Sequence, residues 1–107
     1  MSDPIAVIVR FNGDPDDLLE RFERARRSWI EAQSDGYNSP AFFAICKTAE
    51  GIVILDGWET DEDHKAFGAQ MGPHLQAVGM GMPDHLEHLW IARLGWDSPP
   101  PRQPQTR

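Results

Sequence analysis

An aspartate and a tryptophan two residues apart are the pair best suited to chemistry in this sequence. Asp56 and Trp58 belong to the stretch 52–59, whose apolar and β-branched residues predict a strand, so both side chains share one face. There Asp56 can accept a proton and Trp58 can stack on a planar ligand. The structural alternative, favoured for Trp58, is that the indole packs beneath a helix. For Asp56 an ion pair is equally consistent, and Arg10 is a candidate partner.

His74 is the second candidate proton acceptor. It follows Gly72-Pro73, which is expected to break one helix, and Pro73 suits the first turn of a short new one. The positive end of that helix would favour the neutral imidazole, which can take up a proton. A solvent-exposed surface histidine is an equally good interpretation.

The other three histidines give no local metal motif. His64 lies among charged residues and is expected on the wet face of a helix. His85 and His88 are three residues apart on a predicted strand, so they point to opposite faces. A metal site assembled from His74, His85 or His88 with Asp84 is a weaker alternative. We therefore expect neither a metal ion nor a cofactor.

A set of aromatic and thioether side chains is expected to bind a hydrophobic small molecule. The candidates are Trp58, Phe43, Phe67, Met71 and Tyr37. Such side chains suit an adaptable apolar pocket, although each also suits ordinary packing. Phe42 and Phe43 are adjacent on a predicted strand and must face opposite sides, so only one of them can reach the pocket. Cys46 is expected to be a buried, unreactive thiol.

Four strands and two main helices are predicted in the order β-α-β-β-α-β. The expected strands are 5–11, 40–48, 52–59 and 85–94, and the expected helices are 15–33 and 61–71, with a separate short helix at 73–78. Asp14 and Thr60 are the expected N-caps. This order predicts a ferredoxin-like α+β fold, a four-stranded antiparallel sheet with both helices on one face. The other face is then apolar and bare, which predicts a homodimer.

Composition narrows the class of protein. The 107 residues carry a net charge of −7 and are 40% hydrophobic, as in one small globular domain. The charge disfavours nucleic acid and membrane surfaces as partners. No segment resembles a membrane span or a signal peptide, so we expect a cytoplasmic protein. The expected domain covers residues 1–95, and residues 96–107 are expected to form a proline-rich extended or disordered tail.

Two segments carry a resemblance to a known superfamily. The segment from Ile54 to Phe67, with its Trp58-Glu59-Thr60 step, resembles the dimeric α+β-barrel superfamily. The segment Met71-Gly-Pro-His-Leu75, followed by a Gly/Pro loop and a last strand, is similar to antibiotic-biosynthesis-monooxygenase-like proteins. The resemblance implies a homodimer with a small-molecule pocket between helices and sheet in each protomer. Its members include cofactor-free oxygenases of aromatic polyketides, haem-degrading enzymes, decarboxylases and lactone isomerases, so the fold alone chooses no reaction.

Two hypotheses from different classes follow. The first is a small enzyme that oxidises a hydrophobic or aromatic metabolite without a cofactor, with His74 or Asp56 moving protons. The second is a non-catalytic dimeric barrel that binds a small ligand or acts as a stress-associated accessory domain. A perturbed acid or histidine beside an open apolar cavity favours the enzyme. A space filled by Trp29, Trp58 and Phe67 favours the second hypothesis.

Overall fold

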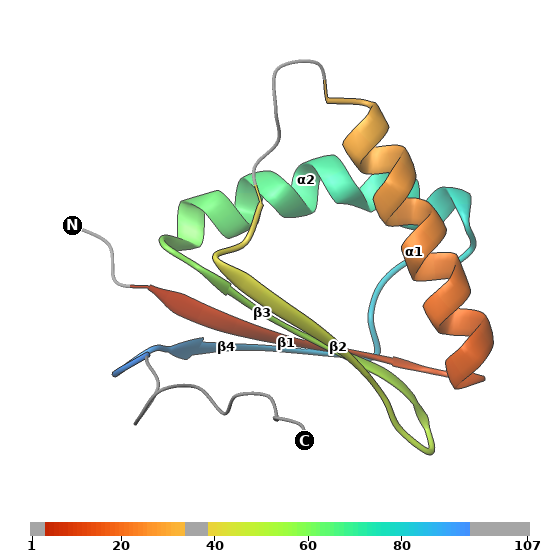
Figure 1. Cartoon of the computed structure of the whole chain (residues 1–107), viewed down its shortest axis with the longest axis horizontal. Coiled ribbons are helices and arrows are strands. Elements are labelled where there is room, and N and C mark those ends of the chain that lie inside the picture. Colours follow the sequence, from red (N-terminus) through yellow and green to blue (C-terminus); the bar gives the residue numbers. More distant parts are fainter. Residues whose placement is uncertain (1–3, 34–38, 95–107) are drawn as a thin grey trace, which may run out of the picture.

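The chain folds as one sheet with two helices on the same side. The computed structural model describes residues 4–33 and 39–94 (Figure 1). The strands are β1 (Ile5–Asn12), β2 (Phe42–Lys47), β3 (Gly51–Trp58) and β4 (His85–Trp90), and the helices are α1 (Pro15–Glu31) and α2 (Asp61–Ala77). The strands form an antiparallel sheet in the order β2-β3-β1-β4. The predicted ferredoxin-like α+β architecture is confirmed, while Tyr37 and the expected tail 96–107 lie outside the described residues.

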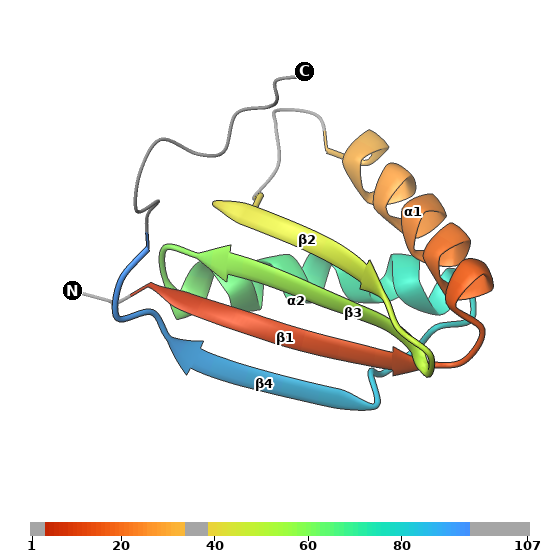
Figure 2. The ribbon, with the colours of Figure 1, turned by 60° about the horizontal axis from the view of Figure 1, so that its bottom comes forward.

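The central strands β1 and β3 determine which side chains face the helices. Ile5 lies opposite Trp58, and Val7 lies opposite Asp56. Because strand side chains alternate, these four residues share the face that the helices cover, and all four are buried. The intervening residues point to the other face, which neither α1 nor α2 covers (Figure 2).

Helix α1 begins where Asp14 and Pro15 predicted its start. The Asp14 side chain accepts a hydrogen bond from the Asp17 N–H at 2.8 Å, and Pro15 holds the first helical position. The buried residues of the helix are Phe22, Ala25 and Trp29. Their spacing of three and four residues confirms the predicted apolar stripe, which packs on the sheet.

Helix α2 is longer than predicted. Thr60 caps it as expected, accepting a hydrogen bond from the Asp63 N–H at 3.0 Å. The expected break before Pro73 is wrong, because the helix continues through this residue. An interior proline removes one hydrogen bond and costs about 3 kcal/mol. Met71 and Leu75, however, pack against the same core on either side of Pro73, so the packing holds both halves in one helix.

A glycine cap ends α2. Gly79 has a φ of +80°, the left-handed region that glycine tolerates best. Its N–H donates to the Gln76 carbonyl at 2.9 Å, and the Met80 N–H donates to the Leu75 carbonyl at 2.9 Å. These two bonds form a Schellman motif and turn the chain toward β4.

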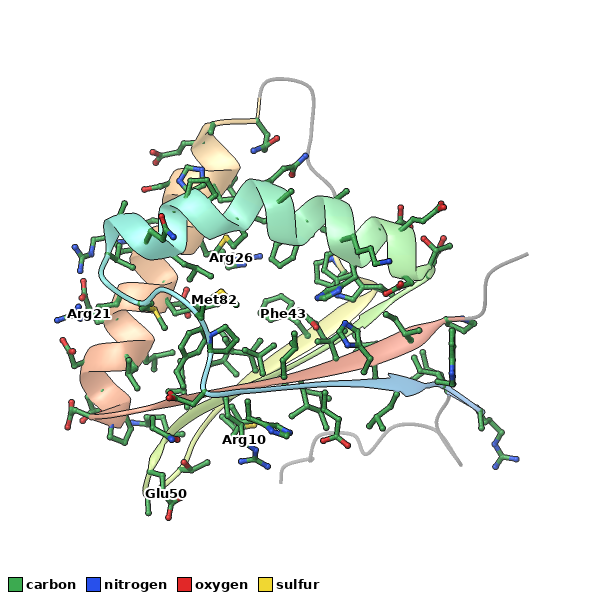
Figure 3. All side chains as sticks on the ribbon, turned by 180° about the vertical axis from the view of Figure 1, so that it is seen from behind. Arg10, Arg21, Arg26, Phe43, Glu50 and Met82 are labelled. Atoms are coloured by element: carbon green, nitrogen blue, oxygen red, sulfur yellow. The ribbon has the colours of Figure 1, made fainter. Side chains whose placement is uncertain are left out.

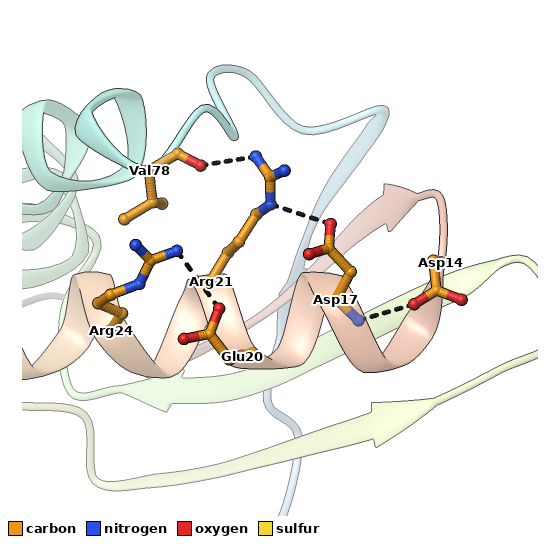
Figure 4. A network of polar contacts seen from close by, with 6 residues as sticks. All are labelled: Asp14, Asp17, Glu20, Arg21, Arg24 and Val78. Atoms are coloured by element: carbon orange, nitrogen blue, oxygen red, sulfur yellow. Dashed lines mark hydrogen bonds and ion pairs between the residues drawn. The ribbon is translucent and has the colours of Figure 1, made fainter.

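One arginine of α1 holds this turn in place (Figure 4). Arg21 Nη1 donates to the Val78 carbonyl at 2.8 Å, and its Nε pairs with the Asp17 carboxylate at 2.9 Å. The end of α2 is therefore tied to α1, and the loop that follows starts from a fixed point. In the part of the chain that is described, no helix is long and apolar enough to cross a membrane.

The uncovered face of the sheet, called here the open face, is apolar at its centre. Strand register places Ile8 and Leu55 side by side on it, and Phe42 lies against Gly57. A Cβ at Gly57 would come within 2.1 Å of the Phe42 ring, so a larger residue there would require the ring to move. Cys46 is exposed, so the expectation of a buried thiol is wrong.

Candidate functional site

Asp56 is a buried carboxyl group on the helix-covered face of β3. Its side chain is 7% exposed, and its Oδ1 atom has no hydrogen-bond partner among the described residues. Burial raises the pKa of Asp56 from 3.8 to about 6, and the nearby Trp58 N–H offsets part of that rise. Trp58 Nε1 is also buried without hydrogen-bond geometry to any described group, so it acts on the carboxyl through proximity. An acid in this setting is a candidate proton acceptor.

A mostly apolar cavity of about 230 Å³ opens beside Asp56, between the sheet, α2 and the loop that leads to β4. Phe67 and Met71 of α2, two of the residues proposed from the sequence to bind substrate, line it, and Met82 lines it from the loop. Asp56 and His64 are its ionisable members. The structure therefore places one buried acid and one histidine against an otherwise apolar surface.

Aromatic rings fill the space next to this cavity. Phe67 packs on Trp58 with ring centroids 4.9 Å apart and meets Trp29 edge-on at 5.0 Å. Trp29 Nε1 donates to Gln70 Oε1 at 3.2 Å. Trp58 is 2% exposed and lies outside the cavity wall, so it supports Phe67 and Asp56.

His64 is a further candidate residue, and the prediction that it lies on the solvated face of a helix is wrong. Its ring contacts Trp58, with centroids 5.7 Å apart, and its Nδ1 atom is buried without a hydrogen-bond partner in the described part of the chain. Burial lowers the pKa of His64, and nearby His88 lowers it further. The spacing of the residues could have predicted this position. His64, Phe67 and Met71 are three and four residues apart, so they share one face of the helix.

The register decides which of the two adjacent phenylalanines faces the helices. Phe43 pairs with Asp56, so it is on the helix-covered face, and the Arg26 guanidinium lies 4.9 Å from its ring centroid. Phe43 and Asp56 also line a smaller cavity of about 20 Å³. In Figure 3, Phe43 and Met82 occupy the layer between sheet and α2, whereas Arg10 projects from the opposite side.

Arg10 and His74 do not lie where the sequence predicted. Arg10 lies opposite Val53 on the open face, so the predicted ion pair with Asp56 is excluded by strand alternation. His74 is in the last turn of α2 and is absent from the walls of the cavity beside Asp56. The predicted benefit of a helix N-terminus does not apply to it. Of the predicted site residues, Asp56, Phe67 and Met71 line the cavity of about 230 Å³, and Phe43 joins these three in the smaller cavity.

The fold of this chain is found in several solved structures. The cofactor-independent oxygenase SnoaB of Streptomyces nogalater is 18% identical, with a TM-score of 0.59 over 91% of this chain and 100% of SnoaB. A monooxygenase from the gene ActVA-Orf6 of Streptomyces coelicolor, solved with the ligand Nanaomycin D, is 15% identical, with a TM-score of 0.58 over 91% and 94%. Rv0793 of Mycobacterium tuberculosis is 18% identical, with a TM-score of 0.54 over 89% and 99%.

At this level of identity, the similarity establishes the fold alone. No protein-family model matches the sequence, and no curated protein matches it either. The chain thus has the fold of the antibiotic-biosynthesis-monooxygenase-like proteins, as its sequence indicated.

Proposed function

We propose that this protein is a cofactor-independent oxygenase of a small hydrophobic or aromatic metabolite, with Asp56 as its general base. The observation that carries the proposal is the Asp56 carboxyl, which is buried, lacks a partner for Oδ1 within the described chain and lines an apolar cavity. With a pKa of about 6 it is mostly ionised at neutral pH, yet basic enough to take a weakly acidic proton.

The proposed reaction needs only a base and a dry cavity. Asp56 removes a proton from a substrate methylene group that adjoining aromatic or carbonyl groups make acidic. The resulting carbanion passes its electrons to dioxygen, and a C–O bond forms. The peroxide takes this proton back from Asp56. The second C–H proton is then lost as the O–O bond breaks, which leaves a ketone and one molecule of water. Apolar walls exclude solvent from the carbanion.

The fold is consistent with this chemistry, because SnoaB is described as a cofactor-independent oxygenase. ActVA-Orf6 was solved with Nanaomycin D, so the fold can hold an organic ligand. Both structures support the proposal by analogy, because a shared fold does not establish a shared function. The proposal itself rests on Asp56 and the cavity beside it.

We also propose a homodimer closed through the open face. Ile8, Val53 and Leu55 occupy its centre, and Leu89 at its side is 42% exposed. An uncovered apolar sheet face is unfavourable in water and is buried well against a second sheet. A second copy of the chain supplies such a sheet.

A binding protein without a reaction is the second candidate. Trp29, Trp58 and Phe67 fill much of the space under α2, and the remaining cavity of about 230 Å³ is small for a ligand site. This packing favours a small ligand and is compatible with binding alone.

The deciding experiment measures dioxygen uptake by the purified chain with a panel of anthrones, which carry such an acidic methylene group. Wild type should consume oxygen, at a rate that falls as the pH drops below about 6 and Asp56 becomes protonated. Asp56→Asn should lower the rate by about 100-fold or more while ligand binding, followed by tryptophan fluorescence, is kept. His74→Ala is the matched control and should leave the rate unchanged. Binding without oxygen uptake by wild type would support the second candidate.

A further inference from the structure

We propose that Asp61, His64 and His88 form a binding site for a divalent transition-metal ion. Asp61 and His64 belong to the first turns of α2, and His88 lies on β4, an edge strand of the sheet. One ligand atom from each residue lies within 4.8 Å of those of the other two. The proposal goes beyond the oxygenase, because the base chemistry of Asp56 requires no metal.

The three residues are the right types for such an ion. Two imidazoles and one carboxylate bind zinc and iron(II), and a set of three leaves coordination positions open for water or a ligand. Bonds of about 2.1 Å at tetrahedral angles place ligand atoms about 3.4 Å apart. The ligand atoms must therefore close by roughly 1.4 Å at most. Because His88 is exposed on an edge strand, rotation of its side chain can supply much of this movement.

His64 is already held for this role. Its ring meets the His88 ring at 5.1 Å and 76°, and it packs against Trp58 on the other side. Its buried Nδ1 has no hydrogen-bond partner in the described ranges, so one of the three cluster residues carries an unsatisfied polar atom.

The surroundings leave room for the ion but include one competing charge. Asp61 and His88 line a second cavity, of about 210 Å³, whereas His64 lines the cavity beside Asp56. The cluster thus lies between two open spaces that solvent can occupy. Lys65 pairs with Asp61 at 3.2 Å, but its side chain is 73% exposed, and such surface pairs are weak. A metal ion can displace the lysine.

Calorimetric titration of the chelator-treated protein with Zn²⁺ tests the site. We expect one ion per protomer, with affinity reduced by about 100-fold or more in His64→Ala and His88→Ala. His85→Ala is the matched control: this residue is on the same strand but the opposite face, and its loss should change nothing. Lys65→Met should tighten binding, because it removes the competing cation.

A Co²⁺ absorption spectrum of the same proteins checks coordination independently of affinity. Wild type and His85→Ala should give the intense visible bands of a low-coordinate site, and His88→Ala should lose them. His88 is exposed, so its variant is expected to fold even if His64→Ala does not; a thermal melt establishes which variants are folded. The site is refuted if wild type shows no saturable binding, or if His88→Ala binds Zn²⁺ as wild type does. Oxygen uptake by the metal-free protein tests the oxygenase separately.

Discussion

In a small monomer, buried polar atoms usually have hydrogen-bond partners and apolar sheet faces are usually covered. The two faces of this sheet each break one of these rules. On the helix-covered face, Asp56, Trp58 and His64 each hold a polar atom that is buried without a hydrogen-bond partner in the described chain. On the open face, Ile8 and Leu55 lie side by side, and both α1 and α2 are on the other side of the sheet (Figure 2). Polar groups are therefore hidden on one side, while apolar groups are left uncovered on the other.

Both departures cost stability in the isolated protomer. A buried polar atom without a partner costs about 1–3 kcal/mol, and an exposed apolar face forgoes about 25 cal/mol for each Å². Each cost is relieved when a second molecule occupies the face: a ligand in the cavity, or another copy of the chain on the open face. A ligand is therefore expected in the cavity, and a second copy of the chain is expected on the open face.

The largest effect is expected on the open face, from Leu55→Arg. A charge at the centre of the proposed interface should abolish the dimer, because it would be buried without a partner. Sedimentation equilibrium should give about 24 kDa for wild type, twice the 12.1 kDa of one chain, and close to the chain mass for the variant. Leu94→Arg, beyond the end of β4, is the control and should remain dimeric. A wild-type mass near 12.1 kDa at micromolar concentration would contradict the dimer.

The next effect is expected on the helix-covered face, from Asp56→Asn. Since the folded pKa of about 6 exceeds the ordinary 3.8, the folded state binds the proton more tightly, and wild type loses stability as pH rises between these values. The full loss corresponds to about 3 kcal/mol. The neutral variant should therefore be more stable than wild type by up to that amount at about pH 8, and the gain should vanish below about pH 4.

Urea unfolding at fixed protein concentration measures this difference. Asp84→Asn is the control with the same change of charge. Asp84 accepts a hydrogen bond from the Asn12 N–H at 2.7 Å and is exposed, so this variant should show no gain at high pH. Equal responses of both variants to pH would show that burial of Asp56 does not govern the effect.

The smallest effect concerns the loop that closes the cavity on the helix-covered face. Arg21→Ala removes the hydrogen bond to the Val78 carbonyl and should cost about 1 kcal/mol, with faster amide exchange in the loop around Met82. Arg24→Ala is closely matched, because Arg24 also pairs with an acid four residues earlier, Glu20 at 3.3 Å, but no bond from it to the loop is found among the described residues. Its cost should be within about 0.5 kcal/mol. If both substitutions lowered the free energy of unfolding equally, the hydrogen bond from Arg21 to the loop would have no special effect on stability.

The features that depend on residues close together in the sequence could be predicted. Hydrophobic periods and caps located both helix starts, and strand alternation correctly placed Asp56 and Trp58 on one face. The interior Pro73 was not predictable, because core packing overrides the local cost of a proline. His64 was misplaced for a similar reason: its charged neighbours suggested solvent, while its contacts with Trp58 and His88 depend on two other elements.

The most direct test of the role given to Asp56 is its own titration. Carbon-13 NMR of the side-chain carboxyl, assigned by comparison with Asp56→Asn, reports the pKa in the folded protein. A midpoint of about 6 is expected, as burial beside the apolar cavity requires. A midpoint near the ordinary 3.8 would mean that the carboxyl is solvated or paired, and it would remove the base from the proposed oxygenase.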